Sequence, residues 1–260
     1  MIRYALLGLV QGVTEFLPVS SSGHLVLGER LLALDPPGVL LEAFLHLGTL
    51  AAVLWVFRAD VAALARAFAQ RGSIERRNEV GFIAAGTVPI VIAGILFRSV
   101  ADTAFGSLTV VGAGLLFTAA ALAVTERLRV RATREQLQFA GSLVVGIAQA
   151  LALVPGVSRS GLTIAAGVSC RIRPARAVRF SFLLSIPALL GATVLNLWDV
   201  ASHGGWGGDW SGIALGTVVS FAVGILGIHA LLGVVRRARL WVFALYCTCV
   251  GLGVLVLDLI

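Results

Sequence analysis

Six long apolar stretches alternate with shorter polar segments along this chain. They lie at about 38 to 57, 79 to 98, 103 to 125, 180 to 198, 211 to 233 and 240 to 259. Each holds about 20 residues, which is enough for a helix to cross roughly 30 Å of hydrocarbon. The pattern therefore predicts six transmembrane helices, with loops between them.

Two further apolar segments, residues 1–32 and 138–170, are interrupted by polar residues. The second has only about 15 residues, or about 22 Å of helix, before its Pro155-Gly156 break, which is too short to cross the hydrocarbon. Arginine clusters flank it on both sides, so it leaves one side of the membrane and returns to the same side. We therefore expect two re-entrant helical hairpins in addition to the six spans, in an all-α integral membrane protein.

The polar parts of these two hairpins are copies of each other. A shift of 138 positions superposes Gly8 on Gly146, Gln11 on Gln149, Val19 on Val157, Ser20 on Ser158, Ser22 on Ser160 and Gly23 on Gly161, without a gap. We interpret residues 1–260 as one membrane domain made of two repeats. The first covers about 1–125, the second about 138–260, and a linker of about 126–137 joins them.

Composition supports the membrane class and excludes a soluble protein. The hydrophobic fraction is 58%, only 13% of residues are charged, and the mean hydropathy is +0.98. The net charge of +7 comes from arginine alone, because the sequence has no lysine. These arginines stand in short clusters between apolar runs and not on one soluble face, so nucleic-acid binding is not expected.

The positions of the arginine clusters predict the topology. They fall in residues 66–77, 127–134, 171–179 and 236–239, and the positive-inside rule places all four in the cytoplasm. The two hairpins must then open in opposite directions, which makes the halves inverted-topology repeats. Such repeats usually carry their binding site near the midplane. Since lipid cannot satisfy polar backbone groups, the hairpin tips are expected to line a cavity.

The first hairpin supplies a carboxylate and an imidazole. Gln11 and Glu15 are four residues apart, so a helix would turn both side chains to one face, where they suit a weak Mg²⁺ or Ca²⁺ site completed by phosphate oxygens. The alternative for Glu15 is a protonated side chain hydrogen-bonded between helices.

His24 is the imidazole of the first hairpin and could act as general acid, general base or nucleophile. A serine of the Ser20-Ser21-Ser22 run could instead be the nucleophile with His24 as its base. The alternative is a serine-rich turn with a structural histidine.

The second hairpin supplies a cation. Arg159 lies in the middle of the hairpin, where an arginine is costly unless it meets an anion, and its guanidinium can bind a phosphate through two nitrogens. Further donors flank it at Ser158, Ser160 and Thr163, and Gly156 and Gly161 allow close backbone approach. A structural ion pair between Arg159 and Glu15 is the competing explanation, and the two are compatible.

Other candidate residues receive simpler interpretations. His46 and His229 lie on apolar spans without partners at ligand spacing, so we expect them to form hydrogen bonds between helices. Glu42 opens the first full span and is expected to mark the membrane interface. Cys170, Cys247 and Cys249 lack metal-site spacing and are expected to be buried thiols.

The two motifs together resemble the signatures of a known family. The sequences Gln11-Gly-Val-Thr-Glu15-Phe-Leu-Pro-Val-Ser-Ser-Ser-Gly-His24 and Pro155-Gly-Val-Ser-Arg159-Ser-Gly-Leu-Thr163 are similar to those of bacterial undecaprenyl-pyrophosphate phosphatases, the BacA-type bacitracin-resistance family. The resemblance spans nearly the whole chain. It implies a multi-pass enzyme of the bacterial plasma membrane, dimeric in tendency, that removes the terminal phosphate of the C55 lipid diphosphate at the outer face. The product is the lipid carrier recycled for peptidoglycan synthesis.

The resemblance also implies roles for individual residues. Glu15 would take part in metal binding or proton transfer, Ser21 and His24 would be catalytic, and Arg159 with Ser158, Ser160 and Thr163 would bind the pyrophosphate. By the same motifs we count Gln11, Ser20, Ser22, Gly156 and Gly161 among the substrate-binding candidates. Many members carry glutamate where this chain has Gln11, which weakens a metal site with two carboxylates.

Two other functions fit parts of the pattern. Inverted repeats with broken helices are also a transporter architecture, so a transporter or flippase of polyprenyl phosphate is the main alternative, alone or combined with the phosphatase. A second lipid phosphatase superfamily carries Ser-Gly-His and Ser-Arg elements. In that superfamily another histidine follows shortly after the Ser-Arg, whereas here none lies between Arg159 and His203.

Overall fold

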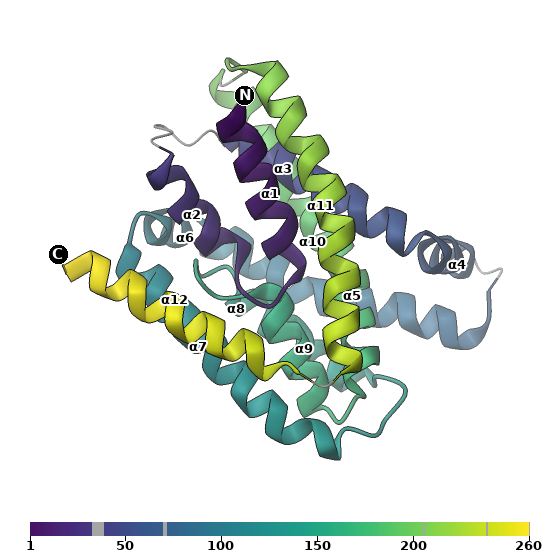
Figure 1. Ribbon diagram of the computed structural model, residues 1–260. Coiled ribbons are helices and arrows are strands. Elements are labelled where there is room, and N and C mark those ends of the chain that lie inside the picture. Colours follow the sequence, from purple (N-terminus) through teal and green to yellow (C-terminus); the bar gives the residue numbers. More distant parts are fainter. Residues whose placement is uncertain (33–38, 70–71, 205, 238, 260) are drawn as a thin grey trace.

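The structure, a computed structural model, describes residues 1–32, 39–69, 72–204, 206–237 and 239–259. These residues form helices and connecting turns (Figure 1). The helices are α1 (Ile2–Phe16), α2 (Ser21–Leu31), α3 (Val39–Val56), α4 (Arg58–Phe68), α5 (Ile74–Leu96), α6 (Arg98–Phe105), α7 (Leu108–Leu128), the 3₁₀ turn η1 (Arg129–Arg131), α8 (Phe139–Leu151), α9 (Arg159–Ser169), α10 (Pro174–His203), α11 (Trp210–Arg236) and α12 (Trp241–Leu259).

The predicted six spans are confirmed. Among the described residues, six helices are long and apolar enough to cross a membrane, namely α3, α5, α7 with its 3₁₀ extension, α10, α11 and α12. Each overlaps one of the six predicted stretches. The fourth span is longer than predicted, because Pro174 starts α10 in its first turn and the helix continues until Gly204 adopts a left-handed φ of 73°. The chain is an all-α integral membrane protein.

Two short helices were missed by the sequence analysis. Residues 58–68 form α4, where only a loop was expected, and residues 98–105 form α6, which covers the expected loop and the adjoining ends of the second and third predicted spans. Both are too polar and too short to span, but Ala-rich sequence such as that of α4 favours a helix on propensity alone. The third span consequently begins at Leu108 and not at 103, after Gly106 and with the hydroxyl of Ser107 accepting the amide of Val110 at 3.3 Å.

The helices pack in pairs that join the first half of the chain to the second. α1 lies along α11, α3 packs between α10 and α11, α7 lies along α12, and α5 packs against α8 (Figure 1). The α8–α9 hairpin reaches the interior of the molecule, where the end of α1 also arrives. The two interrupted segments thus meet between the paired spans.

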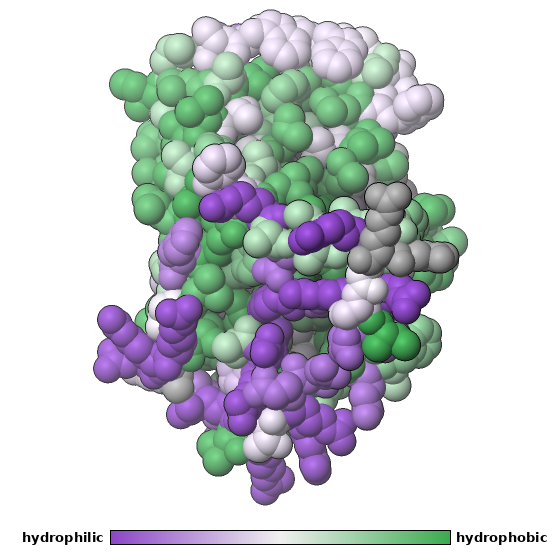
Figure 2. All heavy atoms as spheres, turned by 90° about the vertical axis from the view of Figure 1, so that its right-hand side faces the viewer, coloured by the Kyte–Doolittle hydropathy of each residue, from purple (hydrophilic) through white to green (hydrophobic). Residues whose placement is uncertain are grey.

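Charged residues are concentrated at the end of the molecule where α4 meets α5. Figure 2 faces this end and shows hydrophilic side chains gathered over its lower half, below a hydrophobic upper half. An ion cluster ties three helices together there. Arg179 of α10 donates to Asp60 of α4 at 2.5 Å and pairs with Glu79 of α5, and Arg76 binds Glu79 at 2.8 Å.

Glycines allow the first arm of each hairpin to contact a span of the other half. A Cβ on Gly8 in α1 would lie 2.3 Å from the carbonyl oxygen of Gly216 in α11, and a Cβ on Gly146 in α8 would lie 2.5 Å from that of Gly86 in α5. Small residues of this kind let membrane helices approach closely. The two glycines occupy the same position in the two sequence copies, so both hairpins use the same packing.

The second arm of each hairpin also begins in the same way. Ser20 accepts the amide of Gly23 and lies 3.2 Å from the hydroxyl of Ser22, and Ser158 accepts the amide of Gly161 and lies 3.2 Å from that of Ser160. These are N-cap contacts that begin α2 and α9. The backbone differs between them, because Ser20 has a positive φ of 70° whereas Ser158 has a φ of −79°. Of the two cap residues, the one with a strained backbone is therefore Ser20, directly before Ser21.

Candidate active site

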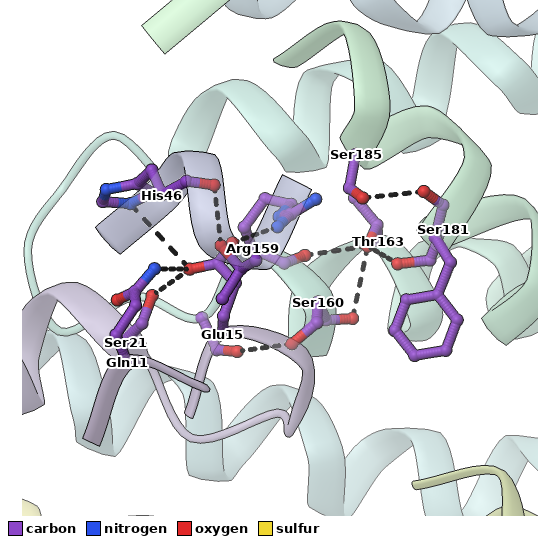
Figure 3. A network of polar contacts seen from close by, with 12 residues as sticks. Gln11, Glu15, Ser21, His46, Arg159, Ser160, Thr163, Ser181 and Ser185 are labelled. Carbon is purple, nitrogen blue, oxygen red and sulfur yellow. Dashed lines mark hydrogen bonds and ion pairs between the residues drawn. The ribbon is translucent and has the colours of Figure 1, made fainter. Parts of the chain in front are cut away.

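Glu15 is the centre of the polar network shown in Figure 3. It lies in the last turn of α1, with 5% of its side chain exposed. Its Oε2 accepts a hydrogen bond from Gln11 Nε2 at 3.1 Å and one from Ser21 Oγ at 2.6 Å. The spacing of four residues explains the first bond, and the break at residues 17–20 brings the start of α2 back for the second. Gln11 thus shares a helix face with Glu15, as the spacing suggested, whereas the contact of Ser21 with the carboxylate was not predicted.

Arg159 reaches Glu15 from the second hairpin. Its Nη2 donates to Glu15 Oε1, and 15% of its side chain is exposed. Arg159 is the first residue of α9, so the guanidinium is placed by the helix start that Ser158 caps. The two tips also touch directly, because Ser160 Oγ donates to the carbonyl of Leu17 at 3.0 Å. The ion pair that the sequence left as an alternative is present, and it joins the two halves.

His46 also belongs to the cluster around Glu15, although its sequence position suggested only a hydrogen bond between helices. Its Nε2 lies 3.9 Å from Glu15 Oε2, and its side chain is 22% exposed, more than that of Glu15 or Arg159. The expectation of a hydrogen bond between helices is wrong, because Nδ1 binds the carbonyl of Glu42 in its own helix at 2.8 Å. His229 likewise binds Ile225 of its own helix. A carbonyl only accepts, so Nδ1 of His46 carries a proton.

The tip of the second hairpin is fixed by α7. Gly156 has a φ of 86°, and a Cβ there would lie 2.1 Å from the carbonyl oxygen of Val111. The amide of Ser158 donates to Thr118 Oγ1 at 2.9 Å, and that hydroxyl also lies 3.3 Å from the carbonyl of Gly156. Gly156 therefore serves close backbone packing here, and by binding Ser158, α7 sets the direction in which the following residue, Arg159, extends.

Most of the other predicted substrate-binding residues are buried and bonded within the protein, and Ser22 is half-buried. The Thr163 hydroxyl lies 2.6 Å from Ser181 Oγ and 2.8 Å from the carbonyl of Arg159. Ser20, Ser158 and Ser160 are at most 3% exposed. In this arrangement they shape the hairpin tips, and Gln11, Ser21 and Arg159 are the predicted residues whose polar groups reach Glu15 (Figure 3). A direct contact of the others with substrate stays a prediction.

His24 is bonded outside this network. Its Nδ1 lies 2.8 Å from the carbonyl of Ser20 and its Nε2 lies 2.7 Å from the hydroxyl of Tyr246 in α12. The two rings stack with centroids 5.6 Å apart. Neither His46 nor Tyr246 could be found from spacing, since each reaches its partner in the first hairpin across the fold and not along its own helix. The useful signal for His46 was its position inside the membrane, which favours function for an ionisable residue.

The residues around Glu15 fit a weakly held divalent cation and not a complete metal site. Within the part of the chain that the structure describes, no group of three or more His, Cys, Asp or Glu side chains could hold a metal ion. Gln11 is fully buried, however, and its Oε1 has no hydrogen-bond partner. That oxygen and the Glu15 carboxylate are ligands of the hard type that Mg²⁺ and Ca²⁺ take, and substrate oxygens and water would supply the rest.

Comparison with known proteins gives one consistent result. Residues 4–253 match the family model described as bacitracin resistance protein BacA. The chain is 39% identical over 277 aligned positions to the undecaprenyl-diphosphatase of Desulfatibacillum aliphaticivorans, covering 100% of this chain and 99% of the relative. It is 42% identical to the protein of the same name from Salinibacter ruber and 41% identical to that from Syntrophotalea carbinolica. The alignments cover 95% of this chain in both cases, and 95% and 94% of the relatives.

Proposed function

The chain belongs to the bacitracin resistance protein BacA family, and from this membership and the geometry at Glu15 we propose that it removes the terminal phosphate of undecaprenyl diphosphate. The product is undecaprenyl phosphate, and the enzyme is a membrane-bound hydrolase. Through the family, its activity is tied to peptidoglycan synthesis and to bacitracin resistance. The observation that carries the proposal is the convergence of a hydroxyl, Ser21, and a guanidinium, Arg159, on one buried carboxylate.

Arg159 is proposed to bind the diphosphate. In the structure its charge is balanced by Glu15, so an arriving diphosphate competes with that carboxylate for the same guanidinium. Arginine suits this exchange because its planar fork can bind carboxylate and phosphate oxygens alike through two nitrogens. His46, the most exposed of the three side chains, borders the position where the second phosphate would lie.

Ser21 is proposed as the nucleophile and Glu15 as its base. The 2.6 Å bond from Ser21 Oγ to Glu15 Oε2 gives the proton a direct path as Oγ forms a bond to the terminal phosphorus. The bridging P–O bond breaks, and the polyprenyl monophosphate leaves with the electron pair. Water then hydrolyses the phosphoserine, which restores the Ser21 hydroxyl and releases inorganic phosphate. Arg159, released from Glu15, stabilises the charge on the transferred group.

A divalent cation completes the proposal. Gln11 Oε1 and Glu15 would hold it, and when bound it would neutralise charge on the phosphate oxygens. The side-chain donors around Glu15 would orient the diphosphate in either case. The chain therefore supplies one carboxylate, one amide oxygen, one hydroxyl and one guanidinium to the reaction.

We further propose how the enzyme sits in the membrane. The protein is a multi-pass membrane protein, and the residues that the structure describes contain six apolar spans. The arginine-rich segments around α4–α5, η1, the α9–α10 turn and the α11–α12 turn would face the cytoplasm by the positive-inside rule. The two halves would then insert in opposite directions, and substrate would reach the site from the outer face of the plasma membrane. The matching glycines and caps of the two hairpins support a duplicated origin. A homodimer is the expected assembly.

Phosphate release by the purified protein tests the function. The protein in lipid nanodiscs would be given C15 and C55 diphosphates, and a C55 monophosphate as a matched control, with and without Mg²⁺. We expect phosphate from both diphosphates and none from the monophosphate. A protein that releases no phosphate, but moves labelled polyprenyl phosphate across a sealed vesicle membrane, would be a transporter and would overturn the proposal.

A further inference from the structure

Helix α12 contributes a tyrosine to the first hairpin, where the motif itself contains none. Tyr246 is 222 residues from His24 in the sequence, yet its hydroxyl lies 2.7 Å from His24 Nε2. The two rings are nearly parallel, with an interplanar angle of 12° and centroids 5.6 Å apart. The tyrosine ring thus lies nearly parallel to the imidazole while its hydroxyl reaches the ring nitrogen.

The hydrogen bonds define which nitrogen of His24 is available for chemistry. Nδ1 lies 2.8 Å from the carbonyl oxygen of Ser20, which can only accept, so Nδ1 carries the proton. In the neutral ring Nε2 then carries the lone pair, and the Tyr246 hydroxyl donates to it. Nε2 is thus the nitrogen with the lone pair, and in the structure the Tyr246 hydroxyl binds that lone pair and holds the ring.

The position of Tyr246 is set by rigid contacts on both sides. The next residue, Cys247, is fully buried and donates its thiol to the carbonyl of Pro18 at 3.5 Å, at the tip of the first hairpin. One turn further along α12, a Cβ on Gly251 would lie 3.0 Å from the carbonyl oxygen of Gly112, so α12 is tightly packed on α7. A hydroxyl placed by such contacts can fix the imidazole with little freedom.

We propose that Tyr246 is a positioning residue of the phosphatase, which orients His24 by donating its hydroxyl to Nε2 and stacking on the imidazole. This rests on the proposed function and on the catalytic role that the family resemblance implies for His24, which lies one helical turn from the nucleophile Ser21. The contact also means that the second half of the chain supplies a group to the first hairpin, in addition to Arg159. Tyr246 acts through His24 and needs no contact with the diphosphate.

The variant Tyr246→Phe tests the proposal because it removes the hydroxyl and keeps the stacked ring. The chain has only two tyrosines, so Tyr4→Phe is a matched control. One neutral hydrogen bond contributes about 0.5–1.5 kcal/mol, which corresponds to a loss of about 2- to 10-fold in kcat. We expect this loss in Tyr246→Phe with an unchanged KM and an unchanged thermal midpoint, and wild-type values in Tyr4→Phe. A wild-type kcat, or a rise in KM alone, would overturn the proposal.

A double-mutant cycle separates positioning from a general structural role. In a His24→Gln background, Tyr246→Phe should have no further effect on the residual rate, since it acts only through the imidazole. Independent effects of the two changes would contradict the assignment.

A measurement without substrate keeps the proposal testable if the phosphatase function fails. The chain has four histidines, and ¹⁵N NMR of the imidazoles should show one Nε2 resonance that moves in Tyr246→Phe and not in Tyr4→Phe. If wild-type protein releases no phosphate, the proposed function is wrong, whether or not this resonance moves. If phosphate is released normally and no resonance moves, only the role of Tyr246 is wrong.

Discussion

Arg159 and Glu15 are 144 residues apart in the sequence and form a largely buried ion pair between the tips of the two hairpins. The ion pair keeps the Arg159 guanidinium at the place where an anionic substrate is expected. It also holds the Glu15 carboxylate beside Ser21. Since a buried ion pair gains little over an apolar contact, stability alone does not explain its presence. The ion pair has a function if Arg159 exchanges the Glu15 carboxylate for the substrate diphosphate.

The geometry of Arg159 predicts a specific effect of a charge-preserving substitution. Arg159→Lys keeps the charge but loses the planar fork, so KM for a polyprenyl diphosphate should rise by about 10-fold or more, for a loss of ~1.4 kcal/mol or more in substrate binding. The control is Arg173→Lys, an exposed arginine paired with Glu135, which should leave both kinetic constants unchanged. Unchanged KM and kcat in Arg159→Lys would remove the bidentate role.

Because Glu15 and the diphosphate compete for Arg159, we expect Glu15→Gln to bind pyrophosphate more tightly and to release phosphate more slowly. In Glu15→Gln, the guanidinium loses its anionic partner, so inorganic pyrophosphate should bind about tenfold more tightly without divalent cations, for ~1.4 kcal/mol of lost competition. Phosphate release should fall strongly, because Ser21 loses its base. Calorimetric titration and the release assay measure the two effects. Weaker pyrophosphate binding in this variant would show that Glu15 assists binding and does not compete with it.

Divalent cations are expected to be required and weakly held. A chelator should abolish turnover, and added Mg²⁺ should restore it. In Gln11→Glu, a second carboxylate would face the same space, so the Mg²⁺ concentration for half-maximal rate should fall. Full activity of the wild-type enzyme in the chelator would eliminate the metal from the mechanism.

Close glycine packing predicts a stability difference between two equally small changes. A methyl group at Gly8 would meet the Gly216 carbonyl oxygen at 2.3 Å, whereas one at Gly253 would meet nothing within 4 Å. Gly8→Ala should therefore destabilise the protein by about 1–3 kcal/mol, as overpacking does, and Gly253→Ala should not. Thermal unfolding in detergent compares them. Equal midpoints would mean that α1 does not pack on α11 as closely as the structure has it.

The sequence predicted the parts of the fold that depend on local pattern. The six spans followed from runs of apolar residues, and Gln11 contacts Glu15 as their spacing of four residues suggested. The pairing of Arg159 with Glu15 was anticipated only as one of two alternatives, because charge shows that a partner is needed but not which one. His46 and Tyr246 could not be predicted, since their neighbours are fixed by how α3 and α12 pack. The helix α4 was missed because it is short and contains charged residues, so it does not form an apolar run.

The central claim is that Ser21, held by Glu15 and facing Arg159, attacks the terminal phosphorus. The most direct measurement is the rate of phosphate release from a polyprenyl diphosphate by Ser21→Ala, with Ser22→Ala as the neighbouring control and pyrophosphate binding as the check on the site. The account predicts that Ser21→Ala binds pyrophosphate normally and loses about 10³-fold or more in kcat, as loss of a nucleophile does. It also predicts that Ser22→Ala retains most of its rate. A Ser21→Ala enzyme with a kcat near that of the wild type would contradict the account.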